Sequence, residues 1–430
     1  MEFNLADLQR DWIEGISGAE FFDCVQGYRS QLETLPMKDR ARGILIEETD
    51  PVQFAAAFFA TVSLAAPVIL ANPNWGRQEG EELARLVAPA MCFGQRYIPL
   101  CGGSPRVGVA SSVEDVNNEL PPASILIPTG GTTGGVKLAI HTWASLEAAC
   151  RGVQAFLGGG AIDSCCVLPL YHVSGLMQLL RSFITGGRIR FDEDEVAGRC
   201  LSYVPTQLQR ALRSEECIRK LNTTRAIFVG GAAMPEGVTQ QARARKMPIV
   251  PVYGMTETAA MVAAVPMQDF LAKLGAAAVP LGETHFSVEL DGRLRISSPA
   301  LFLGYQGRPP INRDAGYLTD DEARLDEDGR LHVIGRMDRL INSGGEKIDP
   351  AEVEAALLHI EGIEEALVVG VPDPEWGQRV VAYYTGAEVS GLKEQLRQWL
   401  APYKVPKSWI RCDALPLDAK GKFVAPRRSS

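Results

Sequence analysis

The sequence has few histidines, no C-x-x-C pair and no excess of positive charge, and each absence argues against a class of protein. Its five histidines show no spacing of the H-E-x-x-H type, so a histidine zinc site is not indicated. Its nine cysteines include no C-x-x-C pair, which favours reduced, mostly buried thiols in a cytoplasmic protein over a disulfide framework. The formal net charge of −9 argues against a nucleic-acid partner, because nucleic-acid binders usually carry a basic face.

One long uncharged segment raises the question of a membrane span. Residues 51–76 contain no charged side chain and are numerous enough to cross a bilayer. Pro67 interrupts the segment, and the pattern around it is that of a helix, a turn and a short buried strand. We therefore expect no membrane span, with a membrane-tethered protein as the alternative.

The order of apolar runs indicates an α/β fold with a smaller domain at its end. Between residues 43 and 252, short β-rich runs alternate with helical stretches, which is typical of layered α/β subdomains around a largely parallel sheet. From about Phe286 onwards, strand pairs around Asp-Gly turns predict a small antiparallel β unit. We expect a large N-terminal domain over residues 1–336 and a small α+β domain over residues 337–430.

Glycine and threonine gather directly after an apolar strand at residues 125–128. Glycine lets backbone amides approach a ligand closely, and such amides, threonine hydroxyls and a lysine together suit phosphate. The segment is neither a Walker A loop nor a G-x-G-x-x-G motif, and its alternative is a flexible surface loop. The residues expected to bind phosphate are Thr129, Gly130, Gly131, Thr132, Thr133, Gly134 and Lys137.

A second group of residues with nucleotide-binding chemistry is Tyr253, Gly254, Thr256 and Glu257. They follow an apolar strand, at the position where open α/β sheets bind ligands. The tyrosine ring offers a flat face for a base, the threonine a hydroxyl for phosphate, and the glutamate a hard oxygen for magnesium.

Single residues elsewhere suit ribose and an acid substrate. The Asp321 carboxylate fits ribose hydroxyls and Arg336 fits phosphate or ribose oxygens, with a surface ion pair as the alternative. His172 follows a strand and can act as a gate or proton carrier, with a structural histidine as the alternative. No G-x-S-x-G surrounds Ser174, so a serine hydrolase is disfavoured.

Taken together, these stretches resemble the superfamily of adenylate-forming enzymes, which includes acyl- and aryl-CoA synthetases, luciferases and the adenylation domains of peptide synthetases. The resemblance covers most of the chain from about residue 125 onwards, with the motifs in the family order. Within the superfamily the chain is most similar to the o-succinylbenzoate:CoA ligases of menaquinone and phylloquinone biosynthesis. The segments that carry this similarity are PLYHVSG (169–175), YVPTQLQRAL (203–212), FVGGAAMP (228–235) and IHTW (140–143).

The resemblance implies a role for each matching residue of the nucleotide site. The segment from Thr129 to Lys137 matches the loop that holds the β- and γ-phosphates of ATP. Gly231 and Ala232 match the strand end beside the adenine, and Tyr253 matches the residue that stacks on it. The remaining matches are Thr256 to the phosphate-contacting threonine, Glu257 to the magnesium carboxylate, Asp321 to the ribose-binding aspartate and Arg336 to the arginine near ribose and phosphate.

The resemblance also implies the residues for catalysis, the acid and CoA. His172 matches the gate near the acyl carboxylate, and Lys422 matches the catalytic lysine, with Lys420 as the alternative. The last matches are Asp338 to the hinge of a mobile C-terminal domain, and Gly344 and Gly345 to the border of the CoA tunnel.

o-Succinylbenzoate carries a second carboxylate, for which an arginine in the acyl pocket would be suitable. Arg181 lies a helix turn or two after the segment from His172 to Gly175 and is the candidate, and Ser174 could donate a further hydrogen bond. The alternative is that Arg181 is a surface residue, since most arginines are exposed.

The activity implied by the resemblance is formation of an acyl-adenylate from an aromatic dicarboxylic acid with ATP and Mg²⁺, followed by acyl transfer to coenzyme A. Two positions depart from the family pattern: Asp320 stands where glycine usually precedes the ribose aspartate, and Val136 stands where proline is common. The alternatives are an acid:CoA ligase for another aryl or fatty acid, and a non-catalytic nucleotide-binding protein on the same fold. The sequence leaves a homo-oligomer open.

Overall fold

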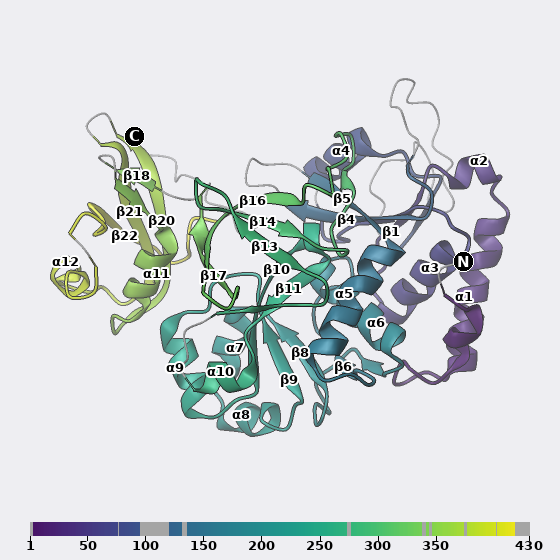
Figure 1. The fold of residues 1–430 in the computed structure, drawn as a ribbon, viewed down its shortest axis with the longest axis horizontal. Coiled ribbons are helices and arrows are strands. Elements are labelled where there is room, and N and C mark those ends of the chain that lie inside the picture. Colours follow the sequence, from purple (N-terminus) through teal and green to yellow (C-terminus); the bar gives the residue numbers. More distant parts are fainter. Residues whose placement is uncertain are drawn as a thin grey trace.

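The computed structural model describes residues 3–75, 77–94, 120–130, 136–272, 277–337, 341–343, 346–373, 376–400 and 402–417. Within these residues the strands form four sheets, three in a large N-terminal α/β domain and one in a small C-terminal domain (Figure 1). The predicted fold class is therefore confirmed.

The first sheet carries the ends of the glycine-rich segment, and its strand order is β15-β5-β4-β2-β1-β3. Its strands are β1 (Ile44–Ile46), β2 (Val68–Leu70), β3 (Met91–Phe93), β4 (Ser124–Gly130), β5 (Val136–Thr142) and β15 (Gly304–Tyr305). Strands β4, β2, β1 and β3 are parallel, as predicted, whereas β5 is antiparallel to both of its neighbours. The connection from β4 to β5 is too short for the crossover that parallel strands need.

The second sheet has the order β12-β11-β10-β9-β8-β6-β7. Its strands are β6 (Ser164–Cys165), β7 (Ile189–Arg190), β8 (Cys200–Tyr203), β9 (Ala226–Val229), β10 (Ile249–Met255), β11 (Ala260–Ala264) and β12 (Val279–Pro280). The five strands from β6 to β10 are parallel, and β11 and β12 add an antiparallel edge beside β10. The short 3-10 helix η2 (Thr256–Thr258) follows the carboxyl end of β10.

The third sheet is the predicted antiparallel unit, and the fourth belongs to the small domain. The third contains β13 (His285–Val288), β14 (Arg293–Ser297), β16 (Tyr317–Leu325) and β17 (Leu331–Arg336). The fourth contains β18 (Ile341–Ser343), β19 (Glu346–Ile348), β20 (Ile363–Asp373), β21 (Gly377–Gly386) and β22 (Ser408–Arg411). With helices α11 (Pro350–Leu358) and α12 (Leu392–Leu396), this sheet forms one end of the molecule in Figure 1.

Helix α3 (Pro51–Ser63) and strand β2 both lie within the uncharged segment, as its pattern predicts. Asp50 caps the helix by accepting a hydrogen bond from the Gln53 amide at 2.8 Å, and Pro51 takes the first helical position. The side chains of α3 from Phe54 onwards are buried in the protein core. Within the described residues, no helix is long and apolar enough to cross a membrane.

Helices pack around the sheets in both domains. Those of the large domain are α1 (Gly18–Glu33), α2 (Met37–Arg40), α4 (Arg77–Leu86), α5 (Trp143–Phe156), α6 (Val173–Thr185), α7 (Pro205–Ala211), α8 (Glu215–Leu221), α9 (Glu236–Ala244) and α10 (Met267–Leu271), with the 3-10 helix η1 (Leu5–Gln9) and α3 already described. Trp12, Phe59 and Phe183 contact one another in the main core. The small domain buries its own cluster, around Val353 and Val380.

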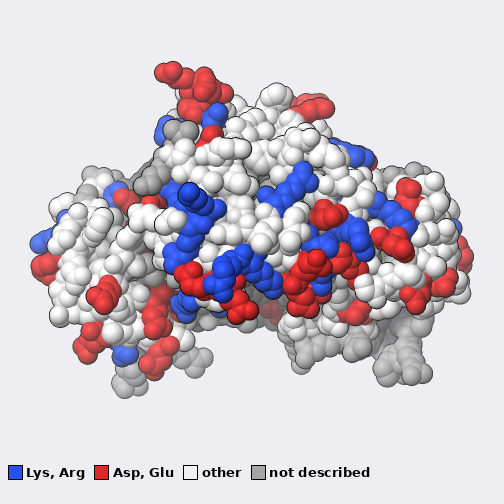
Figure 2. Space-filling view, turned by 90° about the horizontal axis from the view of Figure 1, so that it is seen from below, with Lys and Arg blue, Asp and Glu red and all other residues white. Residues whose placement is uncertain are grey.

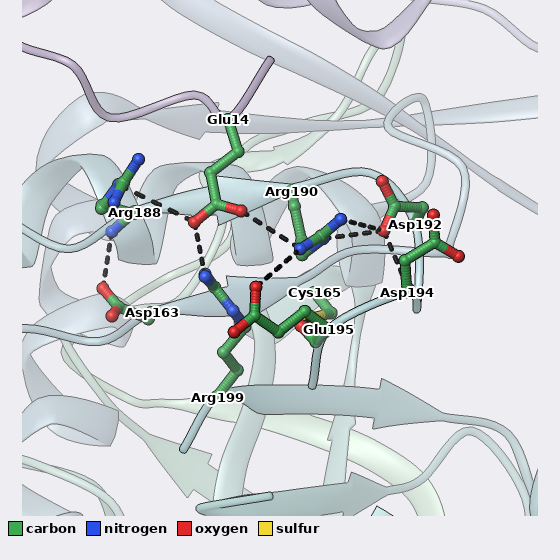
Figure 3. Close-up of polar contacts among 9 residues, drawn as sticks. All are labelled: Glu14, Asp163, Cys165, Arg188, Arg190, Asp192, Asp194, Glu195 and Arg199. Carbon is green, nitrogen blue, oxygen red and sulfur yellow. Dashed lines mark hydrogen bonds and ion pairs between the residues drawn. The ribbon is translucent and has the colours of Figure 1, made fainter. Parts of the chain in front are cut away.

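An ion-pair network attaches the N-terminal segment to the edge of the second sheet (Figure 3). The Glu14 amide donates to the carbonyl oxygen of Ile189 in β7 at 2.8 Å. The Glu14 carboxylate lies 3.3 Å from Arg190 and 2.5 Å from Arg199. These contacts fix the chain before α1 against β7.

The surface carries charges of both signs. On the face seen in Figure 2, lysine and arginine side chains lie beside aspartates and glutamates. Ion pairs among the described residues include Arg245 with Glu215 at 3.3 Å and Arg330 with Asp269 at 2.7 Å. The expectation that no nucleic acid binds remains a prediction.

Candidate active site

The hairpin of β4 and β5 holds both ends of the predicted phosphate segment. Thr129 pairs with Lys137, and Gly130 pairs with Val136. The Val136 amide donates to the Glu82 carboxylate at 2.7 Å, which ties the hairpin to α4. The predicted residues between the two strands, Gly131, Thr132, Thr133 and Gly134, lie outside the described residues.

A sharp turn after β10 carries Thr256 and Glu257. A Cβ atom on Gly254 would lie 1.7 Å from the carbonyl oxygen of Ala260, so only glycine fits at this position. The Thr258 hydroxyl donates to the same carbonyl oxygen at 2.8 Å. The close approach at Gly254 and the hydrogen bond from Thr258 therefore both stabilise this turn.

The Glu257 carboxylate is buried and held by a tyrosine. Its residue is 8% exposed, and it accepts a hydrogen bond from the Tyr305 hydroxyl. Burial and the adjacent Glu257 charge raise the pKa of Tyr305, so this hydroxyl stays protonated and can donate. The Lys137 ammonium lies 5.7 Å from the centre of the Tyr305 ring, so Tyr305 links the carboxylate to the lysine.

These side chains fit a magnesium ion that arrives with a nucleotide. Mg²⁺ usually takes one or two protein carboxylates and completes its shell with phosphate oxygens and water. Glu257 supplies one carboxylate, on a turn that contacts both strands of the β4–β5 hairpin. Within the described residues, no group of three His, Cys, Asp or Glu side chains could hold a metal without such a ligand.

Tyr253, Asp321 and Arg336 meet at the third sheet. Asp321 and Arg336 lie opposite each other across β16 and β17, and a guanidinium nitrogen lies 3.7 Å from the Asp321 carboxylate. The Tyr253 hydroxyl donates to the other Asp321 oxygen. Asp321 is only 4% exposed, whereas the Arg336 side chain is 41% exposed, so the pair lies partly at the surface. The unusual Asp320 carboxylate lies 3.9 Å from Arg336, which offsets its charge.

Gly231 and Ala232 directly follow the β9 region, beside β10 in the parallel sheet. Both residues are exposed, and Gly231 has a φ of 85°, which favours glycine. Because parallel strands end at the same edge, these residues lie at the edge from which Tyr253 and Thr256 emerge.

The acyl-site candidates all belong to α6. His172 is its N-cap residue and is exposed, with its ring 4.8 Å from that of Tyr171. Partial desolvation lowers the pKa of His172. Ser174, in the first turn, is also exposed.

Arg181, in contrast, is 2% exposed, so the surface alternative is wrong. Its guanidinium lies 5.1 Å from the centre of the Phe228 ring. Its Nε atom is buried without a hydrogen-bond partner, and its guanidinium forms no ion pair with the described residues. Desolvation lowers the pKa of Arg181. A buried cation without a carboxylate is costly, which points to a ligand anion as its partner.

Two residues that the sequence did not single out hold the site together, namely Tyr305 and His141. His141 is fully buried, and its Nε2 atom lies 2.7 Å from the carbonyl oxygen of Thr256. His141 lies in the segment IHTW, which carries part of the family similarity but indicates no role for the histidine. No local pattern indicates Tyr305, because its contact with Glu257 depends on the pairing of β15 with β5.

Several predicted residues and one cavity lie apart from this arrangement. In addition to the four residues between β4 and β5, the predicted residues outside the described part of the chain are Asp338, Gly344, Gly345, Lys420 and Lys422. A cavity of about 340 Å³ lies between the N-terminal segment and helices α5 and α6, where Arg10 and Phe183 line it. It contains none of the predicted site residues.

Comparison with known proteins places the chain in a family. The model of the AMP-binding enzyme family matches residues 16–306, and that of the AMP-binding enzyme C-terminal domain matches residues 352–422. The chain is 32% identical to the 2-succinylbenzoate–CoA ligase of Bacillus licheniformis over 75% of each chain, and 32% identical to that of Bacillus velezensis over 92% of this chain and 88% of the relative. Its fold matches o-succinylbenzoate CoA synthetase of Bacillus subtilis, solved with an acyl-adenylate intermediate, with a TM-score of 0.80 at 25% identity over 97% of this chain and 94% of the other. Because the first family model spans well over half of the chain, this protein belongs to the family of AMP-binding enzymes.

Proposed function

We propose that this chain joins 2-succinylbenzoate to coenzyme A through an acyl-adenylate, releasing pyrophosphate and then AMP, as a step of menaquinone or phylloquinone biosynthesis. The names of the relatives and the acyl-adenylate in a solved relative support the chemistry. The observation that carries the proposal for this chain is the convergence of Tyr253, Asp321 and Arg336 with the Thr256–Glu257 turn at one sheet edge. The buried Arg181 supports an acid with a second carboxylate.

In the first step the acid carboxylate attacks the α-phosphorus of ATP, the bond from that phosphorus to the pyrophosphate oxygen breaks, and pyrophosphate leaves. The Tyr253 ring stacks on the adenine, Asp321 accepts from the ribose hydroxyls, and Thr256 donates to phosphate. Arg336, Lys137 and Lys422 neutralise oxygens on which charge develops, since such transfer depends on positioning and electrostatics. Glu257 would hold Mg²⁺, which would screen the phosphate charge.

In the second step the CoA thiolate attacks the acyl carbon, the bond from this carbon to the phosphate oxygen breaks, and AMP leaves. His172 borders the acyl carboxylate, and Ser174 and Arg181 bind the second carboxylate of the acid. The proposed small domain, residues 337–430, turns about Asp338 so that Lys422 leaves and Gly344 and Gly345 border the CoA tunnel. We place the enzyme in the cytoplasm and leave its oligomeric state open.

The proposal is tested by pyrophosphate release from the full chain with ATP, Mg²⁺ and 2-succinylbenzoate, with benzoate and a medium-chain fatty acid in parallel. We expect release with 2-succinylbenzoate alone, and its loss in Glu257→Gln. Release with another acid would keep the chemistry and refute the substrate. No release with any acid would favour a nucleotide-binding protein without catalysis.

A further inference from the structure

A buried histidine lies between the two parts of the nucleotide site and has no role in the steps above. His141 belongs to β5, the strand that also carries Lys137, and is 0% exposed. Its Nε2 atom lies 2.7 Å from the carbonyl oxygen of Thr256, and its Nδ1 atom lies 3.0 Å from the hydroxyl of Ser145 in the first turn of α5. The ring thus joins three elements: the hairpin, the turn after β10 and helix α5.

The direction of these hydrogen bonds follows from the groups themselves. A carbonyl oxygen can only accept, so Nε2 must carry the proton. Burial lowers the pKa of His141 to about 4, so the ring is neutral near pH 7 and Nδ1 is an acceptor. The Ser145 hydroxyl then has two acceptors at 3.0 Å, Nδ1 and the Thr142 carbonyl oxygen, while its oxygen accepts from the Thr142 amide at 3.2 Å. When Ser145 donates to Nδ1, the bonds run in one direction from the Thr142 amide through Ser145 and His141 to Thr256, and each bond polarises the next.

The carbonyl at the end of this chain belongs to a turn that needs external support. The turn is followed by Ala259 and Ala260, which have positive φ angles of 51° and 72° and are therefore strained. On its other side, the Phe302 amide donates to the Glu257 carbonyl at 2.9 Å. His141 supplies the matching contact from the strand of Lys137.

We propose that His141, oriented by Ser145, is a positioning residue for adenylate formation, which holds Thr256 and Glu257 at a fixed distance from Lys137. This inference rests on the proposed function, because it assumes that these three residues act on the ATP phosphates. His141 touches no substrate and acts through the Thr256 carbonyl. Misplacement of a positioned group by about 1 Å can cost about 100-fold in rate.

The test compares four variants of the full chain: His141→Ala, His141→Gln, Ser145→Ala and the control Ser124→Ala. Glutamine can place an amide donor near the position of Nε2, so it should restore the bond to Thr256. Ser124 lies in β4 of the same hairpin and is 0% exposed, and its hydroxyl has no hydrogen-bond partner among the residues that the structure describes, so its loss should remove no hydrogen bond. Thermal unfolding is recorded for each variant, because Ser145 also takes part in the capping box of α5.

Two rates are measured, namely pyrophosphate release with 2-succinylbenzoate and CoA transfer from preformed acyl-adenylate. We expect His141→Ala to lower kcat of the first reaction about 10- to 100-fold with little change in KM for the acid. His141→Gln should recover most of that rate, Ser145→Ala should fall between them, and Ser124→Ala should match the wild type. CoA transfer should change much less, since the pyrophosphate and its charge have left.

An unchanged adenylation rate in His141→Ala, an equal loss in His141→Gln, or an equal loss of both reactions would overturn the inference. If the wild type released no pyrophosphate with any acid, the proposed function would fail instead. In that case, the inference about His141 is tested by the Kd of Mg·ATP in the wild type and the two His141 variants. Weaker binding in His141→Ala but not in His141→Gln supports positioning, and equal binding in both overturns it.

Discussion

Replacing the buried Arg181 should raise stability and weaken substrate binding at the same time. In Arg181→Met an apolar side chain of similar length takes the place of a guanidinium that is 2% exposed and has no carboxylate among the described residues. Exchange of buried charge for apolar side chains of similar volume is often stabilising by about 1–4 kcal/mol. We therefore expect a gain of that size in the free energy of unfolding.

The effect on binding should have the opposite sign. A hydrogen bond to a charged group contributes about 1.5–3 kcal/mol, which corresponds to roughly 10- to 150-fold in KM for 2-succinylbenzoate. Urea unfolding gives the stability, and initial rates of pyrophosphate release give the KM. The control is Arg219→Met, which changes an exposed arginine on α8 and should alter neither quantity. Lower stability with an unchanged KM in Arg181→Met would refute the reasoning and make Arg181 a structural residue of the core.

Three further substitutions test the fold and the site. Burial raises the pKa of Glu47 to about 7, against roughly 4.3 in an unfolded chain. The favourable contribution of the protonated carboxyl group to the free energy of unfolding is therefore full below about pH 4 and is lost as the pH rises through 7. Glu47→Gln should therefore leave urea unfolding unchanged at pH 4.5 and raise stability by about 1–3 kcal/mol at pH 8; an equal change at both pH values would contradict this. Gly254→Ala should lower the melting temperature by several degrees or prevent folding, because its Cβ would lie 1.7 Å from the Ala260 carbonyl oxygen. Tyr305→Phe removes the donor to the Glu257 carboxylate and should raise the Mg²⁺ concentration needed for half-maximal pyrophosphate release by about tenfold, and an unchanged Mg²⁺ dependence would speak against that contact.

The sequence predicts those helices and strands whose ends are set by residues close to them in the chain. The Asp50-Pro51 start and the Pro67 stop mark α3 and β2, because a cap, a first-turn proline and a helix breaker act within a few residues. The Asp-Gly turns predict the antiparallel strands of the third sheet for the same reason.

Local sequence patterns do not predict the contacts between segments that are far apart in the chain. Tyr305 reaches Glu257 only because the two-residue strand β15 pairs with β5, a pairing between residues far apart in the chain. The burial of Arg181 has the same origin. Helix α6 has an apolar stripe that includes Leu176, Leu180 and Phe183, but its polar residues, Arg181 among them, are buried as well. Tyr305 and His141, to which the sequence assigned no role, both act through such long-range contacts.

The most direct test of the proposed reaction is a single turnover with stoichiometric ATP. The full chain, Mg²⁺, ATP and 2-succinylbenzoate are mixed without CoA, the products are quantified by mass spectrometry, and CoA is then added. We expect one equivalent of pyrophosphate with enzyme-bound 2-succinylbenzoyl-adenylate, followed on CoA addition by equal amounts of AMP and thioester. Formation of ADP and phosphate, or of thioester without a preceding adenylate, would contradict the proposed reaction.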